Sequence, residues 1–143
     1  MVESTDISYG LIDGIYNVLK GQVKYNGKTI PVYKTVPKRP ESLYIEIGEV
    51  MGSEDGTKDD FVFFGTVQVI VVDESRHCAD RRHSQRILGE MRKILKSDKG
   101  SVFSVAGAEL VVFSHETMLP IAELSDESIV RSRIIDIYNY VIN

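Results

Sequence analysis

The segment RHCADRRHSQR, residues 76–86, gathers the side chains of this sequence that are best suited to chemistry. It holds Cys78, the only cysteine, together with His77 and His83, two of the three histidines, among four arginines. Thiolate and imidazole groups bind metal ions, and a cysteine beside a histidine can act as a nucleophile with its base. Arginines can instead contact nucleic-acid phosphates or form the charged start of a helix. The spacing of these residues and the elements that carry them decide among these four roles.

Metal binding and cysteine catalysis both fit this spacing poorly. Structural zinc sites pair their ligands at short fixed spacings, whereas Cys78 has no second cysteine and the two histidines lie six residues apart. Within a helix, that separation turns His77 and His83 about 240° away from each other. A nucleophilic Cys78 would need a base and an orienting group, and His115 could approach it only through the tertiary fold. A small enzyme or metal-binding domain that uses these residues stays as the alternative interpretation, and the charged start of a helix is the favoured one.

Composition indicates one globular domain over residues 1–143, because 43% hydrophobic and 27% charged residues are ordinary for a soluble protein. The net charge of −4 argues against a dedicated nucleic-acid binder, since such domains are usually basic. The single cysteine fits a reducing compartment. The first residues, MVESTDISYG, lack a signal-peptide pattern, and no apolar run is long enough to span a membrane. We therefore expect a cytoplasmically folded protein without a membrane contact or a cofactor.

Apolar residues at helical spacing predict two helices, over residues 6–20 and from residue 78 or 79 to residue 96. The apolar stripes comprise Leu11, Ile15, Val18 and Leu19 in the first helix and Ile87, Met91, Ile94 and Leu95 in the second. The second helix carries a basic stripe on its other face, formed by Arg82, Arg86, Lys93 and Lys96. Such a stripe is either a solvated surface or a contact for an acidic partner.

The remaining segments predict strands and loops. Asn26-Gly27 favours a tight hairpin between strands 22–25 and 28–34. Further strands are expected over residues 43–48, 61–72, 102–105, 109–113 and 129–142, with residues 61–72 in the centre of the sheet because both of their faces are largely apolar. Residues 51–60 and 114–127 lack periodicity and are expected to be irregular. The element order predicts an α+β fold, with a mostly antiparallel sheet and both helices packed on one face.

Two polar loops carry opposite charges. Lys38 and Arg39 lie between two prolines, and residues 51–60 contain four acids. In an assembly of identical subunits, one patch can face the other patch of the neighbouring copy, which would steer and align the subunits. With the helical stripe included, the candidate interface residues are Lys38, Arg39, Glu54, Asp55, Asp59, Asp60, Arg82, Arg86, Lys93 and Lys96. We find no candidate catalytic, cofactor-binding or metal-binding residues in which spacing and chemistry agree.

The element order and the segment IPVYKTVPKRPESLYIEIGE, residues 30–49, resemble the tail-terminator and tail-completion proteins of tailed bacteriophages, a family related to neck-ring proteins. The specific block is Pro31-Val32-Tyr33, then Pro37, then residues 44–49, YIEIGE. The acidic loop, the arginine-rich helix and the long terminal strand follow in the family's order. Leu43 stands where proline is usual, Lys34 stands where an acid is common, and the long strand lacks tryptophan. These departures leave room for a related ring or connector.

The resemblance implies a non-enzymatic virion protein that forms a ring at the head-proximal end of the tail, assembled in the host cytoplasm. The ring would be six-fold or a multiple of six and would stop growth of the tail tube. Its partners would be the tail tube protein and neck, head-completion or portal-associated proteins, with genomic DNA passing through the lumen without specific binding. An adaptor unrelated to phages is a further alternative.

Overall fold

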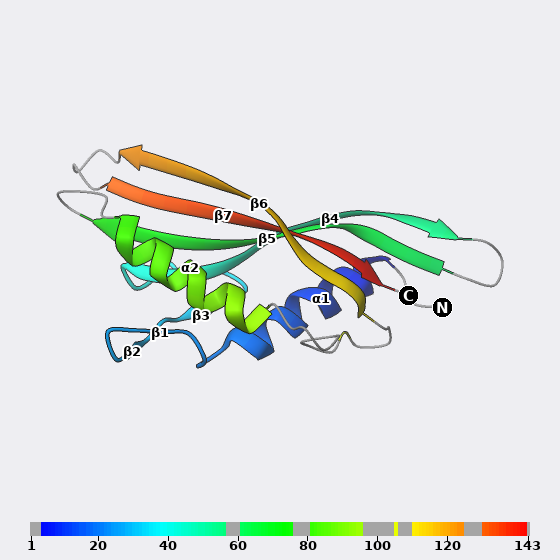
Figure 1. Ribbon diagram of the computed structural model, residues 1–143, viewed down its shortest axis with the longest axis horizontal. Helices are drawn as coiled ribbons and strands as arrows, with labels where there is room; N and C mark the ends of the chain where they lie inside the picture. The colour runs from blue at the N-terminus through cyan, green and yellow to red at the C-terminus, as the bar shows by residue number, and fades with distance from the viewer. Residues whose placement is uncertain are drawn as a thin grey trace.

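In the part of the chain that the computed structural model describes, two helices cover one face of a twisted five-stranded sheet (Figure 1). The structure describes residues 4–56, 61–75, 81–95, 105, 110–124 and 130–142. Its elements are α1 (Ser4–Leu19), β1 (Lys24–Tyr25), β2 (Lys28–Thr29), β3 (Val32–Tyr33), β4 (Leu43–Gly56), β5 (Phe61–Ser75), α2 (Arg81–Leu95), β6 (Leu110–Leu124) and β7 (Val130–Ile142). The predicted α+β fold, with both helices on one face, is confirmed.

The large sheet has the order β3-β4-β5-β7-β6, so β5 lies in its centre as expected. Every pairing in it is antiparallel except that of β3 with β4. β3 pairs only Val32 with Ile45 and Tyr33 with Glu46, so it covers a short part of the outer edge of β4. The long strands extend beyond the helical layer, and the β4–β5 hairpin projects past α1 at one end of the molecule (Figure 1).

The expected hairpin at Asn26-Gly27 is formed by β1 and β2. Both turn residues have positive φ, 50° for Asn26 and 75° for Gly27, as a type I′ turn requires. The strand expected over residues 28–34 is instead divided into β2 and β3 at Ile30-Pro31. Pro31 has no N–H to donate, but its carbonyl oxygen accepts a 2.9 Å hydrogen bond from the amide of Ile45.

The core lies between the sheet and the two helices. Alternate residues of the central strands, such as Val69 and Ile134, face the helices and are buried. The expected helical stripes meet them: Leu11, Ile15, Leu19, Ile87, Met91 and Leu95 are at most 1% exposed. A smaller apolar cluster of Tyr44, Ile70 and Val72 lies outside this main core. Within the described residues, neither helix has the length and apolar content needed to span a bilayer.

Two segments expected to be irregular are strands. β4 continues through residues 51–56, and β6 runs through residues 114–124, so the prediction of loops there was wrong. The reason is the same in both places. Residues 51–53 and 114–121 are exposed, so no buried face imposes an alternating pattern on the sequence. Of the strands expected over residues 102–105 and 109–113, residues 102–104 and 109 lie outside the described part, while residues 110–113 belong to β6.

Candidate functional site

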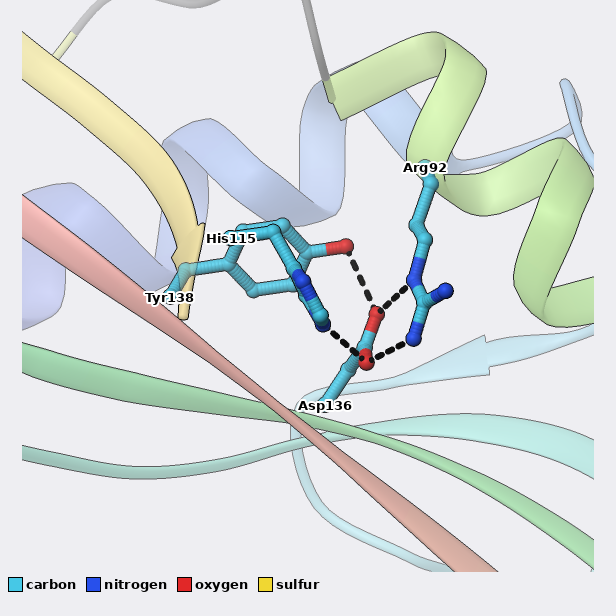
Figure 2. Close-up of polar contacts among 4 residues, drawn as sticks. All are labelled: Arg92, His115, Asp136 and Tyr138. Carbon is cyan, nitrogen blue, oxygen red and sulfur yellow. Dashed lines mark hydrogen bonds and ion pairs between the residues drawn. The ribbon is translucent and has the colours of Figure 1, made fainter. Parts of the chain in front are cut away.

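A buried carboxylate forms the most highly connected polar site in the described part of the chain (Figure 2). Asp136 of β7 is fully buried. Arg92 of α2 donates from Nε to Asp136 Oδ2 at 2.9 Å and from Nη2 to Oδ1 at 2.7 Å. His115 of β6 places Nε2 2.7 Å from Oδ1, and the hydroxyl of Tyr138 donates to Oδ2 at 2.9 Å. These four residues, Arg92, His115, Asp136 and Tyr138, are called the Asp136 cluster below.

The Asp136 cluster uses the full hydrogen-bonding capacity of its carboxylate. Each oxygen accepts two hydrogen bonds, and a carboxylate has about four acceptor positions in total. An ionised carboxylate only accepts, so the contact with Oδ1 is a hydrogen bond in the His115 tautomer that carries a proton on Nε2. The hydrogen bond to Asp136 raises the pKa of Arg92 above its usual value despite partial burial. With all four positions occupied by protein donors, Asp136 has no lone pair left for a substrate proton or a metal ion.

Three elements meet at the Asp136 cluster, which joins the helical layer to the edge of the sheet. A register shift in β6 between His115 and Thr117 lies next to it. Such a bulge breaks the side-chain alternation and directs His115 toward β7. There the imidazole makes an edge contact with the ring of Tyr138, at 5.3 Å between centroids, and Phe113 stacks on that same ring at 4.9 Å. The arrangement holds the exposed edge strand β6 against β7 and α2.

Alkaline titration tests the burial of Tyr138 and Tyr140. Burial, followed by the charge of Asp136, raises the pKa of Tyr138 far above its usual value of about 10, and burial also raises the pKa of Tyr140. Above pH about 10 the unfolded chain loses protons that the folded chain keeps, so the stabilisation is complete below that pH and declines above it. We expect Tyr138 and Tyr140 to ionise only on unfolding, as followed by tyrosinate absorbance. Ionisation of Tyr138 and Tyr140 in the folded protein would contradict the structure, and Tyr138→Phe should remove one tyrosine from the delayed group.

The structure places the chemistry-bearing residues of the sequence in different regions. Residues 76–80, with Cys78 and His77, lie outside the described part, and no side chain is described for His83. His115 is described, and its imidazole is engaged with Asp136. Among the described residues, no group of three histidine, cysteine, aspartate or glutamate side chains could hold a metal ion.

The charged candidates are also separated. Lys38 and Arg39 are exposed on the loop between β3 and β4. Glu54 and Asp55 belong to the end of β4, although their side chains are not described, and Asp59 and Asp60 lie outside the described residues. Arg82 lies in α2 without a described side chain, and Lys96 is outside the described part.

Arg86 and Lys93 are exposed and line a cleft of about 470 Å³ between α2 and the β1–β2 hairpin. The cleft is bounded by Lys24, Tyr25 and Asn26 from the hairpin and by Arg86, Gly89, Glu90 and Lys93 from the helix. It is called the α2 cleft below.

One signal for the Asp136 cluster is present in the sequence, although none of the motifs discussed above includes it. Asp136 lies on the same face of the terminal strand as Ile134 and Tyr138, which are buried. A carboxylate on an apolar face requires a buried cationic or hydrogen-bonding partner. That requirement predicts a partner but does not identify it, because Arg92 is 44 residues away in the chain.

Comparison with known proteins identifies the fold. No protein-family model matches the sequence, and a search of curated proteins gives no match. Among solved structures, a chain of the structure described as "Virion of native gene transfer agent (GTA) particle" shares the fold. The TM-score is 0.69 at 14% sequence identity, and the match covers 96% of this chain and 98% of that chain. At this identity the likeness establishes a common fold over essentially the whole length of both chains.

Proposed function

We propose that the protein is a non-enzymatic structural subunit of a virion, and that it forms a ring at the head-proximal end of a phage tail as a tail terminator or neck connector. The observation that carries the proposal is the fold shared from end to end with a chain of the gene transfer agent virion. The resemblance of residues 30–49 to tail-terminator proteins supports the finer assignment.

Open sheet edges support assembly with other subunits. β3 pairs with only two residues of β4, and β6 forms the opposite edge of the sheet. An exposed edge presents backbone N–H and C=O groups that another chain can pair with. Three apolar residues of β6, Met118, Leu119 and Ile121, are between 38% and 49% exposed. This edge therefore offers both backbone and apolar groups to a neighbouring protein.

The Asp136 cluster supports a structural role over a catalytic one. Its carboxylate is saturated by protein donors, and the raised pKa of Tyr138 keeps that phenol protonated and poorly nucleophilic. The alternative small enzyme would use Cys78 with His77, His83 or His115, and of these three histidines the described imidazole, that of His115, has its Nε2 engaged with Asp136. In the proposed ring, the cluster would keep β6 in place while the strand bears contacts between subunits.

The proposed partners are further copies of this chain in a ring that is six-fold or a multiple of six, the tail tube protein, and neck, head-completion or portal-associated proteins. Genomic DNA would pass through the lumen without specific binding, in line with the net charge of −4. The protein would be located at the tail or neck of the virion.

Co-expression with the tail tube and neck proteins of the same virus tests the proposal. We expect multi-angle light scattering to detect a ring-sized species that contains this chain, because rings of this kind can require their platform in order to assemble. A monomer on its own is compatible with the proposal. A chain that stays monomeric in the presence of every tail and neck partner would refute it.

A further inference from the structure

The α2 cleft has the charge and shape of a binding site for an acidic segment. Three cationic residues, Lys24, Arg86 and Lys93, line it, against one acid, Glu90. Glu90 Oε1 lies 3.3 Å from Lys93 Nζ, but both side chains are exposed, so this ion pair neutralises little of the positive charge of Lys93. Within the described part of the chain, Lys24 and Arg86 form no ion pair. The cleft thus has a net excess of two positive charges, and its volume of about 470 Å³ accommodates a short stretch of polypeptide.

The floor of the α2 cleft leaves space for such a segment. Gly89 of α2 faces it, and a Cβ atom placed on this glycine would meet no atom within 4 Å. The opposite wall is the β1–β2 turn at Asn26, which is exposed. One wall is therefore a helix and the other a tight hairpin, and both present cations toward the same opening.

The chain itself carries a segment of complementary charge. Residues 53–60, SEDGTKDD, contain four acids and one lysine. They lie at the end of the β4–β5 hairpin, because Gly56 pairs with Phe61. This hairpin projects at one end of the molecule, while α2 and the β1–β2 hairpin lie toward the other end (Figure 1). The described end of the β4–β5 hairpin is therefore remote from the α2 cleft of the same copy, which makes the cleft of a neighbouring copy the suitable partner (Figure 1).

We propose that the acidic end of the β4–β5 hairpin of one copy binds in the α2 cleft of the next copy. Such a contact joins two different surfaces head to tail, and an interface of this type forms a ring where the rotation between successive copies closes. This inference rests on the proposed function, since it identifies a contact by which subunits of the ring would join. It differs from the contact expected from the sequence, in which the acids face Lys38 and Arg39. Those two residues are exposed on a loop, whereas the α2 cleft is concave and gathers three cations.

A mixed-label experiment on the full chain tests this contact. One copy, ¹⁵N-labelled and carrying Cys78→Ala, is mixed at millimolar concentration with an unlabelled copy that carries Cys78→Ala and a nitroxide on Lys58→Cys, between β4 and β5. We expect paramagnetic broadening of the amides of Asn26 and Gly89. Because the contact is electrostatic, it should disappear in about 1 M salt, where the Debye length is only about 3 Å.

Two charge reversals of equal size make the test specific. Arg86→Glu with Lys93→Glu in the labelled copy should reduce the broadening roughly fivefold or more, because it inverts the charge of the α2 cleft. Lys38→Glu with Arg39→Glu, also exposed residues, should leave it unchanged. Both variants should keep the dispersed amide spectrum of the folded protein, since none of the four side chains is buried.

Several results would overturn the inference. Broadening centred on residues 38–39 would show that the acidic segment contacts the loop of Lys38 and Arg39. An equal loss of broadening in both charge-reversal variants would indicate non-specific electrostatic attraction. No broadening at all would exclude the contact. Displacement of the nitroxide copy by a short DNA duplex that binds the same amides more tightly would identify the α2 cleft as a phosphate-backbone site instead. Specific broadening without rings on tail or neck partners would refute the proposed function and leave the contact between copies intact.

Discussion

Asp136→Ala is expected to lower the free energy of unfolding by about 3 kcal/mol, which corresponds to a fall of roughly 10 °C in Tm for a domain of this size. The substitution removes the acceptor of four hydrogen bonds and leaves the guanidinium of Arg92 and the hydroxyl of Tyr138 without their partner. Arg92 is 35% exposed, so water can solvate part of its charge and keeps the cost at the lower end of the range for buried pairs. Urea denaturation followed by circular dichroism would measure the change.

An exposed ion pair elsewhere in the chain provides a matched control. Asp13 lies 3.0 Å from Lys34, with side chains 57% and 46% exposed, so Asp13→Ala should cost no more than about 1 kcal/mol. The double variant Asp136→Leu with Arg92→Leu should recover part of the lost stability, because it removes both charges together. If Asp136→Ala proves as stable as Asp13→Ala, the Asp136 cluster does not hold β6 and α2 together as described.

Gly65→Val is expected to cost about 2–3 kcal/mol and to separate the outer half of the β4–β5 hairpin. Gly65 pairs with Gly52, and a Cβ atom on Gly65 would overlap the carbonyl oxygen of Met51 and the Cα of Gly52. These are backbone atoms, so no side-chain rotation relieves the overlap. Hydrogen exchange should show lost protection beyond residue 51 in β4, while the amides of α2 stay protected.

The same substitution tests the role of the hairpin in assembly. If the hairpin end joins two copies, Gly65→Val should abolish association even though the helical layer remains folded. Gly89→Ala is a control for folding stability alone, since Gly89 lines the α2 cleft; a Cβ there meets no atom within 4 Å in the single copy, and alanine in a helix is favoured by up to about 1 kcal/mol over glycine. A Gly65→Val protein with the hydrogen-exchange pattern of the wild type would show that the paired strands β4 and β5 tolerate a side chain at residue 65.

The sequence predicted those parts of the fold in which a local rule and burial agree. Asn26-Gly27 adopts the positive φ values that its turn requires. Residues with helical spacing, such as Leu11 and Ile87, are fully buried. In each case the residue type and its periodicity reflect contacts that lie within one or two turns of the same element.

The parts that the sequence did not predict depend on distant contacts. β6 is an edge strand, exposed along residues 114–121 and interrupted by a bulge, so pairing with β7 orders it without any alternating pattern. The partners of Asp136 come from three elements, and Arg92 looked like one more polar residue of a basic helix. The α2 cleft likewise depends on Lys24, which only the tertiary fold brings beside Arg86.

Cryo-electron microscopy of particles purified from the source of this chain is the sharpest test of the proposed virion ring. We expect a single ring of density at the head-proximal end of the tail, into which the five-stranded sheet and its two helices fit as one subunit per repeat. Within that ring, the β4–β5 hairpin of each subunit should lie against α2 of the next. Absence of this fold from the particle, or its presence as isolated monomers on the capsid surface, would refute the proposed ring.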